Sequence, residues 1–239
     1  VSAGFICFLM KDFIFDTIIF GPKKMDFPTY KFLCQAATFI GVETNFCGDE
    51  FPFVVQNRTM AGQFSAHVMT SVISGFIISF PYVLYEFWKF ISPGLLEKEK
   101  AKSRGFIFIS SILFFVGVLF GYYVISPLSI NFLGTYQVST QVLNEIDLGS
   151  FISLVRSSAL ASGIIFELPI IIYFLTKAGV VTPESLVKYR KYALVLVLIL
   201  AAIITPPDVA SQIIVAIPIV VLYQVSIFIS RIVVKNQNK

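Results

Sequence analysis

The side chains best suited to chemistry in this chain are carboxylates, and the densest group lies in the stretch ISPGLLEKEK, residues 91–100. Here Glu97 and Glu99 alternate with Lys98 and Lys100, and long apolar runs flank the stretch on both sides. Charged side chains are almost never buried without a partner, so such a cluster meets either water or a ligand. The pattern leaves two interpretations, a solvated loop and a binding site.

A further carboxylate, Glu167, lies inside an apolar run in the segment IIFELPII. An unpaired charge in hydrocarbon costs several kcal/mol. Pro169 lacks an N–H and frees a backbone carbonyl upstream, which can accept a proton from a neutral Glu167. Two interpretations follow. One is a neutral glutamate satisfied by hydroxyls or water inside a helix bundle, and the other is a polar site that faces a partner or a water-filled cavity.

The remaining polar side chains do not form the catalytic group of an enzyme. No pair of carboxylates is placed for acid–base chemistry, because they are scattered over positions 86, 97, 99, 167 and 208. Ser162 has no histidine in any later apolar run to act as its base. The single His67 cannot build a metal site, and no glycine-rich phosphate loop is present. We therefore expect no enzyme activity, no metal, no cofactor and no nucleic-acid partner.

The elements that must position these carboxylates are long apolar helices. The chain is 56% hydrophobic and 13% charged, against about 25% charged residues in ordinary globular chains. Several runs approach the ~20 residues that cross the bilayer as a helix. The sequence predicts an all-α polytopic membrane protein, with residues 1–239 as a single integral membrane domain. We expect six transmembrane helices, the first truncated at its N-terminus: 1–10, 64–90, 105–125, 157–176, 192–205 and 213–230.

Basic residues set the expected orientation of these helices. Most lysines and arginines fall in the loops 91–104 and 177–191 and after the last helix, so these segments are predicted to be cytoplasmic. Both termini are then cytoplasmic. Residues 11–63 form a long extracytoplasmic loop, in which 12–22 and 28–41 have the apolar spacing of amphipathic helices.

The three cysteines divide between a helix and this outer loop. Cys7 lies in the first apolar run and is expected to be a buried small apolar residue. Cys34 and Cys47 both lie in the outer loop, where an oxidising environment permits a disulfide. Spacing alone leaves open whether the two sulfur atoms meet.

The last two predicted helices are unusually short. The run 192–205 has about 14 residues and spans roughly 21 Å, less than the bilayer core. The polar segment TPPDVASQ follows it, and Pro218 is expected to interrupt the next helix. The hairpin then thins the bilayer, tilts less than its neighbours, or leaves its polar tip below the outer surface. The other interpretation is a pair of ordinary short helices shielded by neighbouring helices. Ahead of the run 192–205, Thr182 and Pro183 predict the start of a helix. This helix is expected to continue through Lys188 and Arg190 into the hairpin.

Three long motifs give a resemblance to a known family. The segments FPYVLYEFWKFISPGLLEKEK, GIIFELPIIIYFLTKAGVVTPESLVKYRKYALV and TPPDVASQIIVAIPIVVLYQVSIFISR occur in order between residues 64 and 231. Together they are similar to TatC, the multispanning subunit of the twin-arginine protein translocase. The resemblance implies a concave, glove-like arrangement of six transmembrane helices.

The resemblance also implies roles for individual residues. In the family, the first cytoplasmic loop helps to recognise the Arg-Arg pair of a signal peptide, and Glu99, Glu97 and the aromatic Phe90 fall at this place. A carboxylate can accept two parallel hydrogen bonds from a guanidinium, a geometry that selects arginine over lysine. The other implied positions are polar residues in or near the membrane where single-span partners dock: Glu167, Thr205, Gln212 and Asp208.

The expected function is that of a core receptor subunit in the bacterial cytoplasmic membrane. It would bind Arg-Arg signal peptides of folded precursor proteins and assemble the single-span partners TatA and TatB into a multi-subunit complex. Export would be driven by the proton gradient. The alternative is a proton-coupled small-solute secondary transporter in which Glu167 relays protons, although no internal repeat typical of transporters is visible. A scaffold without recognition chemistry is the third interpretation.

Overall fold

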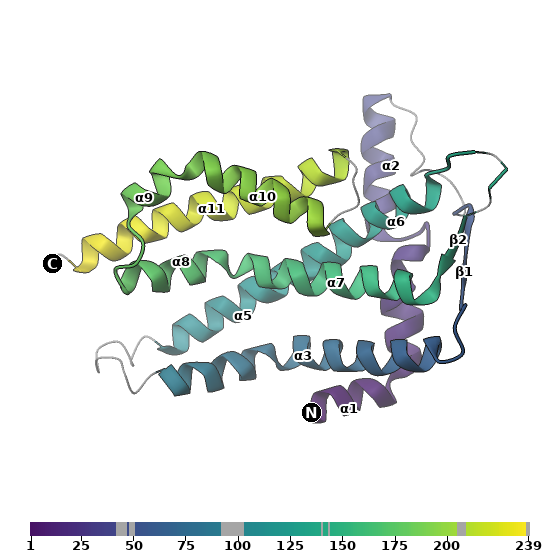
Figure 1. Cartoon of the computed structure of the whole chain (residues 1–239), viewed down its shortest axis with the longest axis horizontal. Coiled ribbons are helices and arrows are strands. Elements are labelled where there is room, and N and C mark those ends of the chain that lie inside the picture. Colours follow the sequence, from purple (N-terminus) through teal and green to yellow (C-terminus); the bar gives the residue numbers. More distant parts are fainter. Residues whose placement is uncertain are drawn as a thin grey trace.

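The computed structural model describes residues 1–41, 47, 51–91, 103–139, 141–142, 144–204 and 209–237. Its long helices lie side by side along one axis, and the C-terminus lies at one end of this bundle (Figure 1). The α-helices are α1 (Ser2–Leu9), α2 (Pro28–Ile40), α3 (Gly62–Ile91), α5 (Ser103–Phe120), α6 (Ser126–Thr135), α7 (Leu148–Phe166), α8 (Leu168–Lys177), α9 (Pro183–Lys188), α10 (Arg190–Ile204) and α11 (Val209–Gln237).

The predicted all-α membrane architecture is confirmed. Within the described part of the chain, four helical stretches are long and apolar enough to cross a bilayer, at Gly62–Phe90, Ile107–Thr135, Leu148–Lys177 and Ser211–Lys235. Each has a mean hydropathy of at least 1.6. The helices α1 and α10 are shorter, with 8 and 15 residues, and they correspond to the first and fifth predicted helices.

Three predicted helices are clearly longer than the sequence indicated, and one of them is the sixth, α11, which covers Val209–Gln237 rather than 213–230. The third continues from α5 through the π-helix η5 (Gly121–Ile125) into α6, and ends at Thr135 rather than at residue 125. The fourth begins at Leu148 rather than at residue 157. Polar residues made the extensions of the third and fourth helices look like loop. Both extensions stay helical because they bury apolar side chains, Leu128 and Ile130 in the first and Phe151 and Ile152 in the second.

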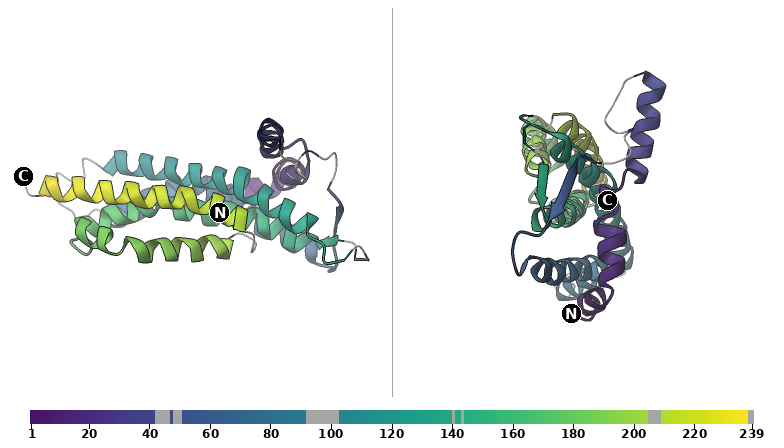
Figure 2. Two further views of the ribbon diagram at one scale, coloured as in Figure 1. Left: turned by 90° about the horizontal axis from the view of Figure 1, so that it is seen from above. Right: turned by 90° about the vertical axis from the view of Figure 1, so that its right-hand side faces the viewer.

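The segment before α3 packs as short helices against one end of the bundle. The predicted helix at 12–22 is a π-helix, η1 (Phe13–Ile19), followed by a turn of 3₁₀-helix, η2 (Gly21–Lys23). The predicted helix at 28–41 is α2, which ends at Gly41 in the left-handed region with φ 76°. Seen from the end of the bundle, α2 projects away from the long helices (Figure 2).

A buried tyrosine attaches this segment to the bundle. The Tyr30 hydroxyl on α2 lies 2.9 Å from the carbonyl oxygens of both Pro22 and Pro127, and its side chain is completely buried. Burial raises the pKa of Tyr30, because ionisation would place a phenolate among apolar groups. The neutral hydroxyl therefore links η2 to α6.

A small parallel sheet joins the starts of two long helices. Strand β1 (Phe53–Gln56), just before α3, pairs in parallel with β2 (Asn144–Asp147), just before α7. An ion pair of 3.0 Å between Arg58 and Glu145 lies beside it, and the Asp147 side chain accepts a hydrogen bond from Ser150 N–H as the N-cap of α7. The sequence pattern did not predict this pairing.

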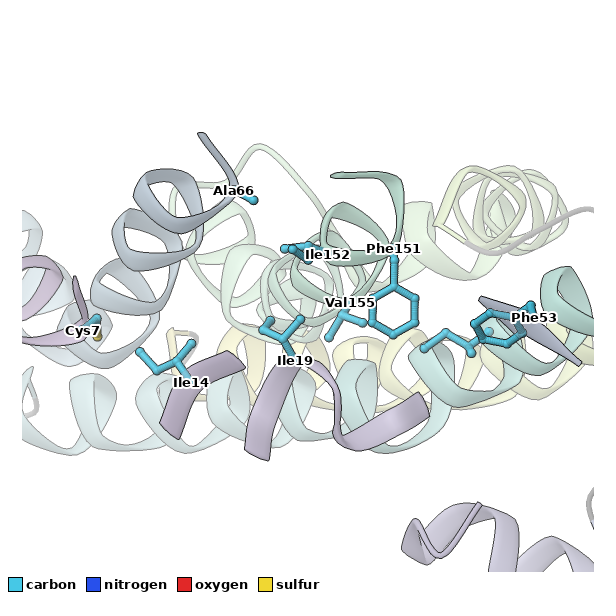
Figure 3. Packing of buried hydrophobic residues seen from close by; sticks show 9 residues of the cluster. Cys7, Ile14, Ile19, Phe53, Ala66, Phe151, Ile152 and Val155 are labelled. Atoms are coloured by element: carbon cyan, nitrogen blue, oxygen red, sulfur yellow. The ribbon is translucent and has the colours of Figure 1, made fainter. Parts of the chain in front are cut away.

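The apolar core at this end of the molecule draws on many elements. Cys7, Ile14, Ile19, Val155 and Phe53 belong to one buried cluster, and in Figure 3 they follow one another in a row from Cys7 on the left to Phe53 on the right. The cluster fixes the helices α1 and η1 against α3 and α7. Cys7 is a free, buried thiol, as the sequence predicted.

The second core lies under the hairpin of α10 and α11. Val197 and Ala201 on α10 pack with Val215 and Ile219 on α11 against Ile125 of η5. In Figure 1 the described ends of α10 and α11 stop well short of the end where β1 and β2 lie. Helix α10, with 15 residues, is short as expected. Helix α11 has 29 residues and contains a candidate span of 25, so the expectation of a short last helix is wrong.

Two details of this region differ from the predictions. Helix α11 is continuous through Pro218, which does not interrupt it. The buried neighbours of Pro218 pack on the second core, and this packing outweighs one lost backbone hydrogen bond. The Thr182 cap and Pro183 start α9 as predicted, but α9 ends at Lys188 and α10 starts separately at Arg190.

Candidate functional site

Glu167 lies at the junction of α7 and α8, inside the longest candidate span, and is only 8% exposed. Its Oε2 accepts a hydrogen bond of 2.5 Å from the Ser110 hydroxyl on α5. Its Oε1 is also buried but has no hydrogen-bond partner among the residues that the structure describes. One oxygen of this carboxyl group therefore has a partner within the chain, and the other is buried without a hydrogen bond to a described residue.

The chain turns slightly at Glu167 because of Pro169. Proline cannot donate to the carbonyl of Ile165, so the α-helical hydrogen-bond ladder stops and restarts. The Glu167 backbone N–H instead reaches the carbonyls of Ile164 and Ile165, and the Glu167 carbonyl accepts from the N–H of Ile170. The predicted donation from the Glu167 side chain to a freed carbonyl is not formed. Among the described residues, the Glu167 side chain accepts from the hydroxyl of Ser110, the kind of partner that the first interpretation expected.

Close packing of α5 and η5 on α7 places Ser110 opposite Glu167. A Cβ added at Gly117 would lie 2.7 Å from the Ser162 carbonyl oxygen, and one at Gly121 would lie 2.4 Å from the Ser158 carbonyl oxygen. Small residues four apart allow two membrane helices to approach at backbone distance. The sequence analysis missed this contact, although the spacing of Gly117 and Gly121 was the signal that could have revealed it.

The predicted signal-peptide residues are described only in part. Phe90, at the end of α3, is 83% exposed, while the preceding Trp88 is buried and packs against Phe174 of α8 with ring centroids 5.7 Å apart. Glu97 and Glu99 lie outside the described residues. Their roles remain predictions, and the structure contributes an aromatic side chain that is free to contact a ligand just before them.

Of the predicted hairpin residues, the structure describes Gln212. The Gln212 Nε2 on α11 donates to the Leu198 carbonyl oxygen on α10 at 3.1 Å. The amide therefore braces the hairpin in this structure. Thr205 and Asp208, which were predicted to join Gln212 in a polar cluster, lie outside the described residues.

The outer-loop cysteines are joined in the structure. Cys34 and Cys47 form a disulfide, with their Cα atoms 5.2 Å apart. The disulfide links the middle of α2 to the segment that follows it. Of the two possibilities left open by the spacing, the structure has the paired form.

The only histidine of the chain has a packing role. His67 on α3 stacks on the Phe8 ring with centroids 4.0 Å apart, and its Nε2 lies 3.0 Å from the Phe8 carbonyl oxygen. Within the described ranges, no three His, Cys, Asp or Glu side chains are grouped to hold a metal ion. His67 therefore fastens α1 to α3.

Comparisons with known proteins place this architecture among protein translocases. The sequence model of one family, described as Sec-independent protein translocase protein (TatC), matches residues 1–218. The TatC of Blattabacterium sp. subsp. Periplaneta americana is 45% identical over 238 residues, which cover 99% of this chain and 90% of the relative. The TatC of Aquifex aeolicus is 39% identical over 175 residues, or 72% of each chain.

Solved structures give the same relationship. A crystal structure of the twin-arginine translocase receptor TatC superimposes with a TM-score of 0.63 at 32% identity, covering 97% of this chain and 94% of that chain. A second crystal structure of that receptor, in DDM, has the same TM-score and identity. The similarity extends over nearly the full length, so it includes the Glu167 region and the hairpin of α10 and α11.

Proposed function

This chain belongs to the TatC family of Sec-independent protein translocase proteins, as its motifs predicted, and from that premise we propose that it is the core receptor of a twin-arginine translocase. Family membership makes it a membrane-embedded transport protein rather than a classical enzyme. In the proposed function it binds Arg-Arg signal peptides of folded precursors, assembles single-span partners of the TatA and TatB type, and supports export driven by the proton gradient.

The observation that carries the assembly part is the half-satisfied carboxyl group of Glu167. Hydrocarbon offers no hydrogen-bond partner, and we propose that a partner helix displaces the groups that cover Oε1 and brings a polar group to this buried oxygen. Each such contact is worth only about 1 kcal/mol, which suits assembly that must also come apart. Thr205, Gln212 and Asp208 are proposed to extend this polar surface at the hairpin.

The assembly proposal is tested by co-purification of the full chain with its single-span partners. We expect Glu167→Ala to reduce their recovery several-fold. Ser110→Ala removes the internal bond and leaves the carboxyl group in place, so recovery should be retained. Glu184→Ala, which removes an exposed carboxylate on α9, is the matched control. Undiminished recovery with Glu167→Ala would show that this carboxyl group has only an internal structural role.

The receptor part rests on the exposed Phe90 and on the chemistry of the two glutamates that follow it. A carboxylate distinguishes arginine from lysine through two parallel hydrogen bonds. We propose that Glu99 is the main guanidinium ligand, that Glu97 contributes less, and that Phe90 contacts the apolar part of the signal peptide. The experiment is crosslinking of a twin-arginine signal peptide to full-length protein carrying Glu99→Lys or Glu97→Lys. We expect Glu99→Lys to abolish crosslinking and Glu97→Lys to reduce it less, and equal tolerance of both changes would remove the assignment.

The proposed setting is the bacterial cytoplasmic membrane, with both termini cytoplasmic and residues 1–239 acting as one membrane domain. In it, loops 91–104 and 177–191 face the cytoplasm and the segment 11–63 faces outward. Labelling of single cysteines at 104 and 58 with a membrane-impermeant maleimide in intact cells tests this orientation. Only the cysteine at 58 should react.

The alternative function, a proton-coupled transporter of small solutes, uses the same Glu167 as a proton relay. Membership in a protein translocase family favours the export of proteins instead. A transporter would show proton-coupled uptake of a small solute by vesicles that contain this chain alone. Such uptake, abolished by Glu167→Gln, would support the alternative.

A further inference from the structure

A basic groove runs between α9 and the last turns of α11, far from the carboxyl group of Glu167. Its volume is about 640 Å³. Three exposed cations line it, Lys188 on α9 and Arg231 and Lys235 on α11, with a single carboxylate from Glu184. None of the three cations forms an ion pair with a described residue. The groove therefore carries a net positive charge that the described chain does not neutralise.

The walls of the groove are held in place by specific contacts. The Tyr223 hydroxyl on α11 donates to the Leu186 carbonyl oxygen on α9 at 2.9 Å, which fixes the spacing of the two helices. Arg231 and Lys235 are four residues apart, so they share one face of α11. The cations are thus set at defined positions rather than on a mobile segment.

The groove lies where a transmembrane helix meets a membrane surface. The candidate span of α11 ends at Lys235, so Arg231 and Lys235 occupy its last turn and a half. Tyr189 and Tyr192 lie beside the groove, with the Lys188 and Lys191 ammonium groups 5.8 Å and 5.2 Å from their respective ring centroids. Tyrosine and lysine together are characteristic of the headgroup level of a bilayer.

We propose that this groove binds the phosphate group of an anionic phospholipid. Lys188, Arg231 and Lys235 face the phosphate, while Val187 and Val234, which also line the groove, contact the glycerol region. Basic pockets beside transmembrane helices bind anionic lipid headgroups in this way. A lipid is favoured over a free phosphate ion because valines share the groove with the cations and the apolar surface of α11 continues from it toward the membrane core.

The test is lipid binding to the full-length protein in detergent micelles, measured by native mass spectrometry with phosphatidylglycerol and phosphatidylethanolamine. The groove variant combines Lys188→Gln, Arg231→Gln and Lys235→Gln. Each basic residue near a surface is worth about fivefold in affinity, so we expect roughly hundredfold weaker binding of phosphatidylglycerol. The control combines Lys89→Gln, Lys177→Gln and Lys31→Gln, which removes the same charge outside the groove, and it should retain most of the binding.

The outcomes separate the lipid site from simpler explanations. Equal losses in the groove variant and the control would mean that basic residues attract anionic lipid generally, and the site would be rejected. Saturable binding of inorganic phosphate without lipid, competing with phosphatidylglycerol, would identify a free-anion site instead. If the triple variant does not fold, Lys235→Gln alone must still weaken phosphatidylglycerol about fivefold. An unchanged affinity would overturn the proposal.

Discussion

Replacing Gly121 by alanine should force α7 away from η5 and destabilise the bundle. The added Cβ would lie 2.4 Å from the Ser158 carbonyl oxygen and 2.7 Å from the Ala159 Cα, whereas ordinary contacts begin at 3.4 Å. Both neighbours are backbone atoms, so rotation of a side chain cannot relieve the clash. The helices must separate locally by about 1 Å, and overpacking of this kind costs about 1–3 kcal/mol.

Gly105→Ala is the matched control, because an added Cβ at Gly105 meets nothing within 4 Å. Both changes gain the helix propensity of alanine, so their difference isolates the packing term. Unfolding of the protein in mild detergent by SDS can be followed through Trp88, the only tryptophan of the chain. We expect Gly121→Ala to lower the free energy of unfolding by about 1–3 kcal/mol relative to Gly105→Ala. Equal stability of the two variants would refute the close-contact reasoning.

Three further predictions use the same unfolding measurement. Burial raises the pKa of Tyr30, so the contribution of its neutral hydroxyl to the free energy of unfolding is complete below the unfolded-state pKa of about 10 and falls as pH rises above it. Tyr30→Phe should abolish this loss of stability at alkaline pH. A loss that persists in the variant would have to come from another group. Cys34→Ser removes the disulfide to Cys47 and should lower the free energy of unfolding by about 3 kcal/mol. Dithiothreitol should destabilise the parent protein by the same amount and leave the variant unchanged. Thr182→Ala removes the cap that accepts from Ser185 N–H and should cost about 1 kcal/mol, an effect absent if water replaces the cap.

The long helices were predictable because lipid leaves the backbone no alternative to internal hydrogen bonds. Their ends were harder to predict. The segment 126–135 contains serine, asparagine and proline and reads as a loop, but burial of the apolar Leu128 and Ile130 against other elements keeps it helical. Pro218 was given too much weight for the same reason. Local propensity is a weak signal when packing fixes the element.

The sequence predicted that Glu167 lies within a membrane helix, but it did not predict which side chain forms a hydrogen bond with it. One carboxylate in an apolar run is visible in the sequence, so Glu167 was found directly. Ser110 is one hydroxyl among many, and its contact with Glu167 depends on the rotation of α5 against α7 that Gly117 and Gly121 permit. The packing of the helices, rather than the residue type, decides which hydroxyl meets Glu167.

The backbone pairing of β1 with β2 constrains the membrane topology of the chain, independently of how the basic residues are distributed between its loops. Backbone amides cannot pair through a layer of lipid, so Gln56 and Asp147, which are in register, must emerge at the same surface. The chain between them must then traverse the membrane an even number of times. Helix α3 and the continuous α5–α6 rod provide one passage in each direction. A topology with an odd number of passages in this interval would have to break this backbone pairing.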